Sequence, residues 1–224
     1  AARYTPKDSD DSGVTYEALT FYGRDVDAAP LLDYELAEYF RCYALEANPS
    51  VNANIHMLGA LRRAGYAADH PAVQKIVRFL QSTAFWFDKW HTSPYYPTAH
   101  GVIACDGYVD ELAADAVSWI LSTQNADGSW GYYMPTAEET AYCLQALAIW
   151  KRTGHEVAPE VLQRGSEWLQ AHAEPTYPPL WIGKCLYSPT RVVRSTVLSA
   201  LALVIEELGV SYDNAKTQPM AVHV

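Results

Sequence analysis

The sequence predicts an all-helical protein built from helical hairpins. Runs rich in Leu, Ala and Glu, with apolar residues three and four positions apart, recur along the 224 residues, whereas the period-two alternation of strands is rare. Two kinds of helix alternate at about 40–50 residues per pair, which is typical of hairpins that stack into a solenoid or close into a toroid.

The apolar periodicity predicts eight helices along the chain. They fall near residues 10–22, 33–46, 51–64, 71–84, 110–123, 136–152, 158–171 and 190–207. The linkers carry Pro and Gly, as in Tyr95-Tyr96-Pro97 and Tyr177-Pro178-Pro179. We expect one domain over residues 1–210 and a loose C-terminal tail over residues 211–224.

The two helix types differ in where their apolar residues lie. One type places an aromatic residue before an apolar residue near its end, at Phe79, Trp119 and Trp168. The other is rich in small and apolar residues all round, as expected for helices that are buried on both sides; it covers residues 52–61, 137–150 and 192–205. In a closed toroid, helices of the second type line a central cavity and their N-termini gather at one end.

Composition excludes several classes of protein. The formal net charge of −10 argues against a nucleic-acid partner, because a phosphate backbone requires a basic face. No stretch reaches the roughly 18 apolar residues of a membrane helix, and no signal peptide opens the chain, so we expect a cytoplasmic protein. The four cysteines form no Cys-x-x-Cys pair and are expected to be reduced.

The segment from Gln124 to Gly131 reads Gln-Asn-Ala-Asp-Gly-Ser-Trp-Gly and predicts a structural staple. Gln124 can bond backbone groups at a helix end. The pair Asp127-Gly128 predicts a tight turn that requires a positive φ. Trp130 can then stack back over the helix.

A cluster of carboxylates opens the chain, at Asp8, Asp10 and Asp11. Such a cluster can cap a helix, with Asp at the N-cap and acidic residues in the first turn. It can also serve chemistry, because three carboxyls within one turn cannot all ionise cheaply and the pKa of one of them rises. A neutral carboxylic acid is the group that protonation of an unactivated alkene demands.

These two segments together resemble class II diterpene cyclases, in particular bacterial copalyl diphosphate synthases. Residues 124–131 match the QW motif of that family, and residues 8–11 match its DxDD motif. The resemblance implies an alpha-alpha toroid of helical hairpins, the β domain of a terpene cyclase. It also implies that Asp10 is the general acid, oriented and tuned by Asp8 and Asp11.

A third match concerns the partner of the acid. In the related squalene–hopene cyclases, a similar stretch carries a His that hydrogen-bonds the catalytic Asp, with an acidic residue four positions earlier. His56 matches that His, while Asn52 stands in the place of the acidic residue. Residues four apart share one helix face, so a capping Asn and a core His would give the same spacing.

Two further strings narrow the family. Residues 88–98 are similar to a segment of bacterial and fungal copalyl diphosphate synthases, and residues 180–187 to the Trp-Ile-Gly-Lys string of plant-type ones. The resemblance extends from position 6 to about position 205. It includes nothing equivalent to the γ domain that precedes this domain in the family. We therefore expect an incomplete toroid that is inactive alone, with a γ domain of the same polypeptide as its missing partner.

The resemblance implies cyclisation of geranylgeranyl diphosphate to a copalyl diphosphate of the ent-copalyl type, with the diphosphate retained. Lys184, Arg191 and Arg194, at the start of the last inner helix, are the expected diphosphate ligands, with Lys89 as a further candidate. Magnesium is expected to bind through the phosphates. For the wall of the pocket we expect aromatic residues, which stabilise carbocations: Trp90 and Tyr96, with Trp86, Tyr95, Tyr132 and Tyr133. The final base stays open among His91, His100, Tyr96 and a bound water.

Three alternatives stand beside this interpretation. The chain could be a class II cyclase making another bicyclic diphosphate, such as a halimadienyl skeleton. It could be a protein prenyltransferase β-like subunit, which needs a zinc site of Asp, Cys and His; Cys105-Asp106 is the local hint. A non-catalytic helical repeat module would instead have no buried acid and no deep cavity.

Overall fold

The structure, a computed structural model, describes residues 6–83, 85–174 and 176–209, and in this part of the chain most residues lie in helices. The helices are α1 (Ser9–Phe21), a 3₁₀ segment η1 (Ala29–Tyr34), α2 (Val51–Arg63), α3 (Pro71–Ser82), α4 (Tyr95–Cys105), α5 (Asp110–Ser122), α6 (Ala137–Arg152), α7 (Pro159–Ala171) and α8 (Thr190–Leu208). A short antiparallel hairpin pairs β1 (Trp181–Ile182) with β2 (Leu186–Tyr187). The predicted tail, residues 211–224, lies outside the described residues.

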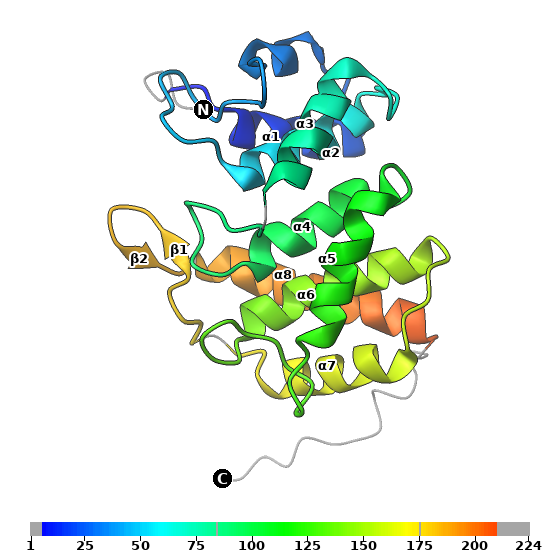
Figure 1. Cartoon of the computed structure of the whole chain (residues 1–224). Helices are drawn as coiled ribbons and strands as arrows, with labels where there is room; N and C mark the ends of the chain where they lie inside the picture. Colours follow the sequence, from blue (N-terminus) through cyan, green and yellow to red (C-terminus); the bar gives the residue numbers. More distant parts are fainter. Residues whose placement is uncertain (1–5, 84, 175, 210–224) are drawn as a thin grey trace.

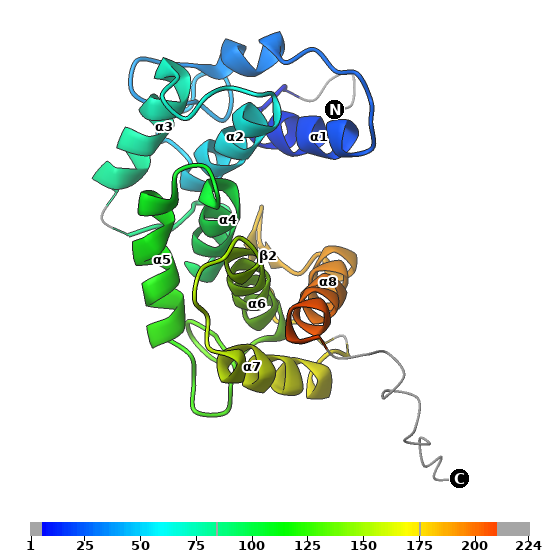
Figure 2. The same ribbon diagram turned by 90° about the vertical axis from the view of Figure 1, so that its right-hand side faces the viewer.

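Figure 1 shows the helices stacked from the N-terminal α1, α2 and α3 down to α7, and the view in Figure 2 shows that they form two layers of an arc. Figure 2 shows α1, α2, α4, α6 and α8 following one another along the inner side, with α3, α5 and α7 outside them. Each inner helix packs against the next, α5 and α7 each pack against two inner neighbours, and α3 packs against α2. The predicted alternation of two helix types is confirmed in its order, because the three all-round apolar segments are α2, α6 and α8, and the three aromatic-ended ones are α3, α5 and α7. The expected burial on both sides is wrong for α8, which buries one stripe of residues and leaves Val192 and Leu198 exposed.

The inner helices run parallel to one another. Gly13 lies against the backbone of His56, and seven residues further on in each helix Arg63 bonds Thr20, so α1 and α2 point the same way. Similar cross-links join α6 to α8 in the middle and at the end of α6: Gln145 bonds the carbonyl of Thr196, and Arg152 pairs with Glu206 and Glu207 further along α8. As predicted, the N-termini of these helices therefore gather at one end.

Burial follows from this arrangement. Residues 51–61, which make up most of α2, are all buried, and so are most residues of α6, because these helices have neighbours on every side. By contrast, α3 and α7 bury one face, as amphipathic outer helices do. The core fills the space between the layers with aliphatic side chains such as Leu58, Leu61, Leu144 and Leu147.

The segment from Gln124 to Gly131 forms the expected staple between α5 and α7. Gln124 Nε2 donates to the carbonyls of Gly128 and Val161, 3.0 Å each. Trp130 is fully buried, and its Nε1 donates to the carbonyl of Ile120 at 2.8 Å. Gly128 has a φ of +94°, so the turn takes the predicted positive-φ conformation.

The predicted helix over residues 33–46 is wrong. The structure has only the short η1 before this segment, then an isolated bridge between Glu35 and Phe40. The side chain of Asn54 accepts from the backbone N–H of Phe40 at 2.8 Å and donates to its carbonyl at 2.9 Å. These bonds occupy the backbone N–H and carbonyl groups of the buried Phe40, which a helix would have needed for its own hydrogen bonds.

Two elements were missed. The segment Tyr95-Tyr96-Pro97, expected to be a linker, is the first turn of α4. Pro97 is tolerated there because the first N–H groups of a helix have no intrahelical partner. The hairpin of β1 and β2 was not predicted either, since two-residue strands leave no alternation to read.

No helix in the described part of the chain is long and apolar enough to cross a membrane.

Replacing Gly128 with Ala should destabilise the fold by about 2–4 kcal/mol. A Cβ at this position would lie 2.5 Å from the carbonyl oxygen of Arg164, in addition to the strain of the positive φ. Gly154→Ala is the matched control, because Gly154 has a φ of +102° but nothing within 4 Å of an added Cβ. Denaturant unfolding should show a loss of only about 1 kcal/mol for the control; equal losses would contradict the staple contact.

Candidate active site

A cavity of about 770 Å³ lies on the inner side of the arc. All five inner helices contribute to its wall, because their inner faces converge there. Its lining is Val14, Glu17, Ile55, His56, Gly59, Arg62, Arg63, His100, Ile103, Ala104, Tyr142, Gln145, Ile149, Thr196, Ser199 and Leu203. About half of the lining residues are apolar, and the polar ones include two histidines and two arginines at separate places along the wall.

A chain of three titratable groups runs from α1 into this cavity. His56 Nδ1 lies 2.7 Å from Asp10 Oδ1, and His56 Nε2 lies 2.8 Å from Nδ1 of His100. Asp10 is in the first turn of α1, His56 in the second turn of α2 and His100 in the middle of α4. The two histidines line the cavity, so the carboxyl group of Asp10 is directly connected to its wall.

Burial lowers the pKa of His100 well below its ordinary value, and the nearby His56 and His91 lower it further. His100 is therefore neutral at pH 7, with one N–H. If its Nδ1 donates to Nε2 of His56, then Nδ1 of a neutral His56 donates to Asp10. If its Nδ1 accepts instead, the bonds run the other way. In both cases His100 fixes which nitrogen of His56 carries the proton.

Asn52 and His56 share a helix face, as their spacing predicted. Asn52 Nδ2 lies 3.3 Å from His56 Nδ1 and donates to the hydroxyl of Tyr96 at 3.2 Å. The Asn52 amide oxygen is buried and has no hydrogen-bond partner among the described residues. The ring of Tyr96 stacks on His91, with ring centres 4.7 Å apart. Asn52 and Tyr96 thus form a buried layer behind His56.

The other two carboxylates of the opening cluster have different surroundings. Asp8 is the N-cap of α1 and accepts from the backbone N–H of Asp11 at 2.7 Å. Burial raises the pKa of Asp8, and the charges of Asp11 and Asp10 add to that rise, while the bond from Asp11 opposes it. Asp11 is exposed. The capping interpretation therefore holds for Asp8, and it is compatible with an acid two residues later.

The cations predicted to bind a diphosphate do not line the cavity. Lys184, Arg191 and Arg194 are exposed, in the hairpin and at the start of α8. Lys89 pairs with Glu46, and its ammonium group lies 5.6 Å from the ring centre of the half-exposed Trp90.

Arg62 and Arg63 are the cations that do line it, and the sequence analysis missed them. They form the last turn of α2, seven residues along from His56. Glu17 lies beside them; burial raises the pKa of its carboxyl group, and His56, Arg62 and Arg63 oppose that rise. Two adjacent arginines at the end of an otherwise buried helix were the signal that could have identified this part of the site.

The aromatic wall also differs from expectation. None of the six predicted aromatic residues is in the cavity lining, where Tyr142 of α6 is the aromatic residue that contributes. Its hydroxyl donates at 3.0 Å to the buried carboxylate of Glu138, which also accepts from Trp181 at 2.7 Å. Of the groups considered for the final proton transfer, His100 lines the cavity, whereas His91 and Tyr96 are buried behind it.

Two layers of helices around an inner cavity, with an Asp–His pair next to it, define an alpha-alpha toroid of the terpene cyclase type. The chain belongs to the family of the squalene-hopene cyclase C-terminal domain, whose model matches residues 30–176.

Similar proteins agree with this assignment. The chain is 46% identical over 209 residues to the Type B diterpene cyclase of Mycobacterium tuberculosis (strain ATCC 25618 / H37Rv), which covers 90% of this chain and 42% of that protein. It is 40% identical over 215 residues to the ent-copalyl diphosphate synthase of Streptomyces sp. (strain KO-3988), covering 88% and 41%. The solved structure of ent-copalyl diphosphate synthase from Streptomyces platensis matches with a TM-score of 0.79 at 38% identity, covering 89% and 42%.

The predicted resemblance to class II diterpene cyclases and the predicted toroid fold are thereby confirmed. The chain spans about two-fifths of the length of the relatives it matches. The zinc set expected for a prenyltransferase subunit is not assembled in the described residues, because Cys105 is fully buried and is not part of the group that Asp106 forms with Asp110 and His155.

The buried neutral His100 should make stability depend on pH. Its pKa is lower in the folded than in the unfolded chain, so the unfolded chain binds more protons and stability falls as the pH drops below about 6.5. The slope from this one group is at most about 1.4 kcal/mol per pH unit. Denaturant unfolding between pH 7.5 and 5 should show that the free energy of unfolding depends less steeply on pH in His100→Gln than in the parent chain. The exposed His172→Gln is the control, and an unchanged slope in His100→Gln would contradict the effect.

Proposed function

We propose that this chain carries the proton donor and part of the cavity of a class II diterpene cyclase, and that the whole enzyme converts geranylgeranyl diphosphate to a copalyl-type diphosphate. The observation that carries the proposal is the 2.7 Å contact between Asp10 Oδ1 and His56 Nδ1 beside the cavity. The names of the relatives, a diterpene cyclase and ent-copalyl diphosphate synthases, support the substrate and the product type.

In the proposed reaction, Asp10 transfers its carboxyl proton to the terminal double bond of the substrate, forming a C–H bond and a tertiary carbocation. Two internal double bonds then attack in turn, closing two rings. Loss of a proton from carbon restores a double bond, so no atoms other than the shuttled proton enter or leave. The carbon–oxygen bond to the diphosphate stays intact throughout.

His56 suits the first step because it lies where charge develops. When Asp10 becomes a carboxylate, an N–H donated from His56 Nδ1 at 2.7 Å stabilises that negative charge. His100 acts through His56, since it holds the other ring nitrogen at 2.8 Å. Tyr142 contributes an aromatic wall, and its bond to Glu138 makes the ring a richer π donor toward a carbocation.

The cavity offers a place for each end of such a substrate. Its volume of about 770 Å³ lies within the usual range for small-molecule sites. Ile55, Ile103, Ile149 and Leu203 supply apolar wall for the isoprenoid part. The relatives are more than twice as long as this chain, and we propose that a further domain of the same polypeptide closes the cavity over the substrate.

We place the diphosphate at Arg62 and Arg63, because these cations line the cavity at a distance of about 10 Å along α2 from His56. Magnesium would be held there mainly by the phosphate oxygens, with Glu17 as the neighbouring carboxylate, and would neutralise the charge of the diphosphate. The exposed cluster of Lys184, Arg191 and Arg194 is the competing location.

In a full-length enzyme that contains this chain, Asp10→Asn should reduce cyclisation at least about a thousandfold and leave the fold intact. The assay is incubation with geranylgeranyl diphosphate and magnesium, followed by dephosphorylation and mass spectrometry of the alcohols. Absence of released pyrophosphate checks that the diphosphate is retained. Asp115→Asn, which alters an exposed carboxylate on the outer helix α5, is the control and should stay active. Retained turnover in Asp10→Asn would show that another group is the acid.

Substitution of both Arg62 and Arg63 by Gln should raise the KM for geranylgeranyl diphosphate by about tenfold or more, because two charge-assisted bonds to the diphosphate are lost. The triple variant of Lys184, Arg191 and Arg194 to Gln is the comparison and should bind substrate nearly as tightly as the parent. Steady-state kinetics on both, with circular dichroism to verify folding, separates the two locations. The reverse result would place the diphosphate at the start of α8.

A further inference from the structure

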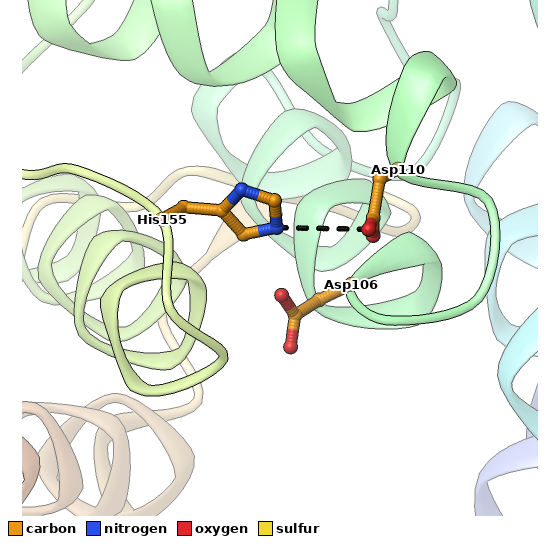
Figure 3. Close-up of side chains that lie close together, drawn as sticks. All are labelled: Asp106, Asp110 and His155. Carbon is orange, nitrogen blue, oxygen red and sulfur yellow. Dashed lines mark ion pairs between the residues drawn. The ribbon is translucent and has the colours of Figure 1, made fainter.

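A second group of titratable side chains lies away from the acid site, at the opposite end of the inner helices. Asp106 is the C-cap of α4, Asp110 is the first residue of α5, and His155 follows the end of α6. Figure 3 shows the three side chains converging from these separate segments. One carboxylate oxygen from each Asp and one ring nitrogen of His155 all lie within 4.8 Å of one another.

Each carboxylate is held by one oxygen, which leaves the other oxygen free. The hydroxyl of Thr153 donates to Asp106 Oδ1 at 2.5 Å, and the backbone N–H of Gly107 donates to Asp110 Oδ1 at 2.6 Å. Asp106 is only 3% exposed, and its Oδ2 has no hydrogen-bond partner among the described residues. Outer partners of this kind orient the ligands of a metal ion.

The position of the histidine ring is fixed as well. His155 stacks on Trp150, with ring centres 3.6 Å apart and planes 6° from parallel. Its Nε2 lies 3.6 Å from Asp110 Oδ2, which is too long for a hydrogen bond. Bonds of about 2.0–2.2 Å to one ion at the tetrahedral angle place neighbouring ligand atoms about 3.3–3.6 Å apart. The observed spacing fits that arrangement, and a side-chain rotation of Asp106 would complete it.

The charge of the group calls for a cation. The group contains two carboxylates and one imidazole, and Asp106 is buried, so its negative charge is costly without a counter-charge. Among the described residues, no Lys or Arg forms an ion pair with Asp106 or Asp110.

We propose that Asp106, Asp110 and His155 bind a divalent metal ion, with zinc preferred over manganese and magnesium. The imidazole ligand favours zinc, whereas an all-oxygen set would favour magnesium. The ion ties the turn between α4 and α5 to the turn after α6, so its role is structural. The site shares no residue with the acid site or the cavity lining, and it stands or fails independently of the cyclase activity.

The test is zinc binding by the full chain after treatment with a chelator and gel filtration. Isothermal titration with Zn²⁺ should give one ion per chain, and thermal unfolding should shift upward with zinc more than with Mn²⁺ or Mg²⁺. Cobalt, used as a spectroscopic probe, should give visible absorption bands of a low-coordinate site. His155→Gln and Asp110→Asn should each weaken zinc binding at least about tenfold.

His172→Gln is the matched control, because His172 also stacks on a Trp, with its ring 3.9 Å from that of Trp168, but belongs to no group of metal ligands in the described residues. It should bind zinc like the parent chain. Thr153→Ala keeps all three ligands and should weaken binding less than loss of a ligand does. Equal zinc binding by the parent and His155→Gln, or no stoichiometric binding by the parent, would overturn the proposal.

Discussion

Helices α2 and α6 have neighbours on every side, and this constraint decides which polar side chains the inner layer can hold. A buried polar group without a partner is costly, so specific neighbours satisfy most of the polar groups that these two helices bury. Asn54 uses its amide to hold the backbone of Phe40, and Glu138 collects bonds from Tyr142 and Trp181. His56 is satisfied through both ring nitrogens. The contacts of His56 with Asp10 and His100 therefore also satisfy polar groups that burial of the inner helices would otherwise leave without partners.

The direction of the inner helices places different residues of the site at its two ends. Because they run parallel, their first turns bring Asp10, Asn52 and Tyr96 together at one end, while their last turns carry Arg62 and Arg63 at the other. The proton donor and the diphosphate-binding cations that we propose are thus kept apart along the cavity wall. Separation limits the Coulomb interaction between the arginines and the carboxyl group of Asp10, since such interactions weaken with distance.

Much of the fold could be predicted from sequence because the buried faces of helices require apolar residues at regular spacing. The outer helices were predicted from their single apolar face, and α2, α6 and α8 from their all-round apolarity. Prediction failed where a contact distant in sequence decided the local structure, as when Asn54 captured Phe40 and prevented a helix over residues 33–46. The pairing of Asp10 with His56 followed from family resemblance and is observed as a contact. Lys184 was predicted to bind the diphosphate but does not line the cavity. Its position depends on the hairpin of β1 and β2, whose two-residue strands give no recognisable sequence pattern.

Gly13 determines how closely α1 approaches α2 next to the contact between Asp10 and His56. It lies one turn beyond Asp10 and rests on the backbone of His56, where even a methyl group would come within 3.2 Å of the carbonyl oxygen. Gly13, which has no side chain, therefore sets the spacing between α1 and α2. That spacing in turn sets the distance between the carboxyl group of Asp10 and the ring of His56. Enlarging that residue would press α1 away from α2 and lengthen the contact between Asp10 and His56 without changing either side chain. The proton donor that we propose thus depends on a position with no chemistry of its own.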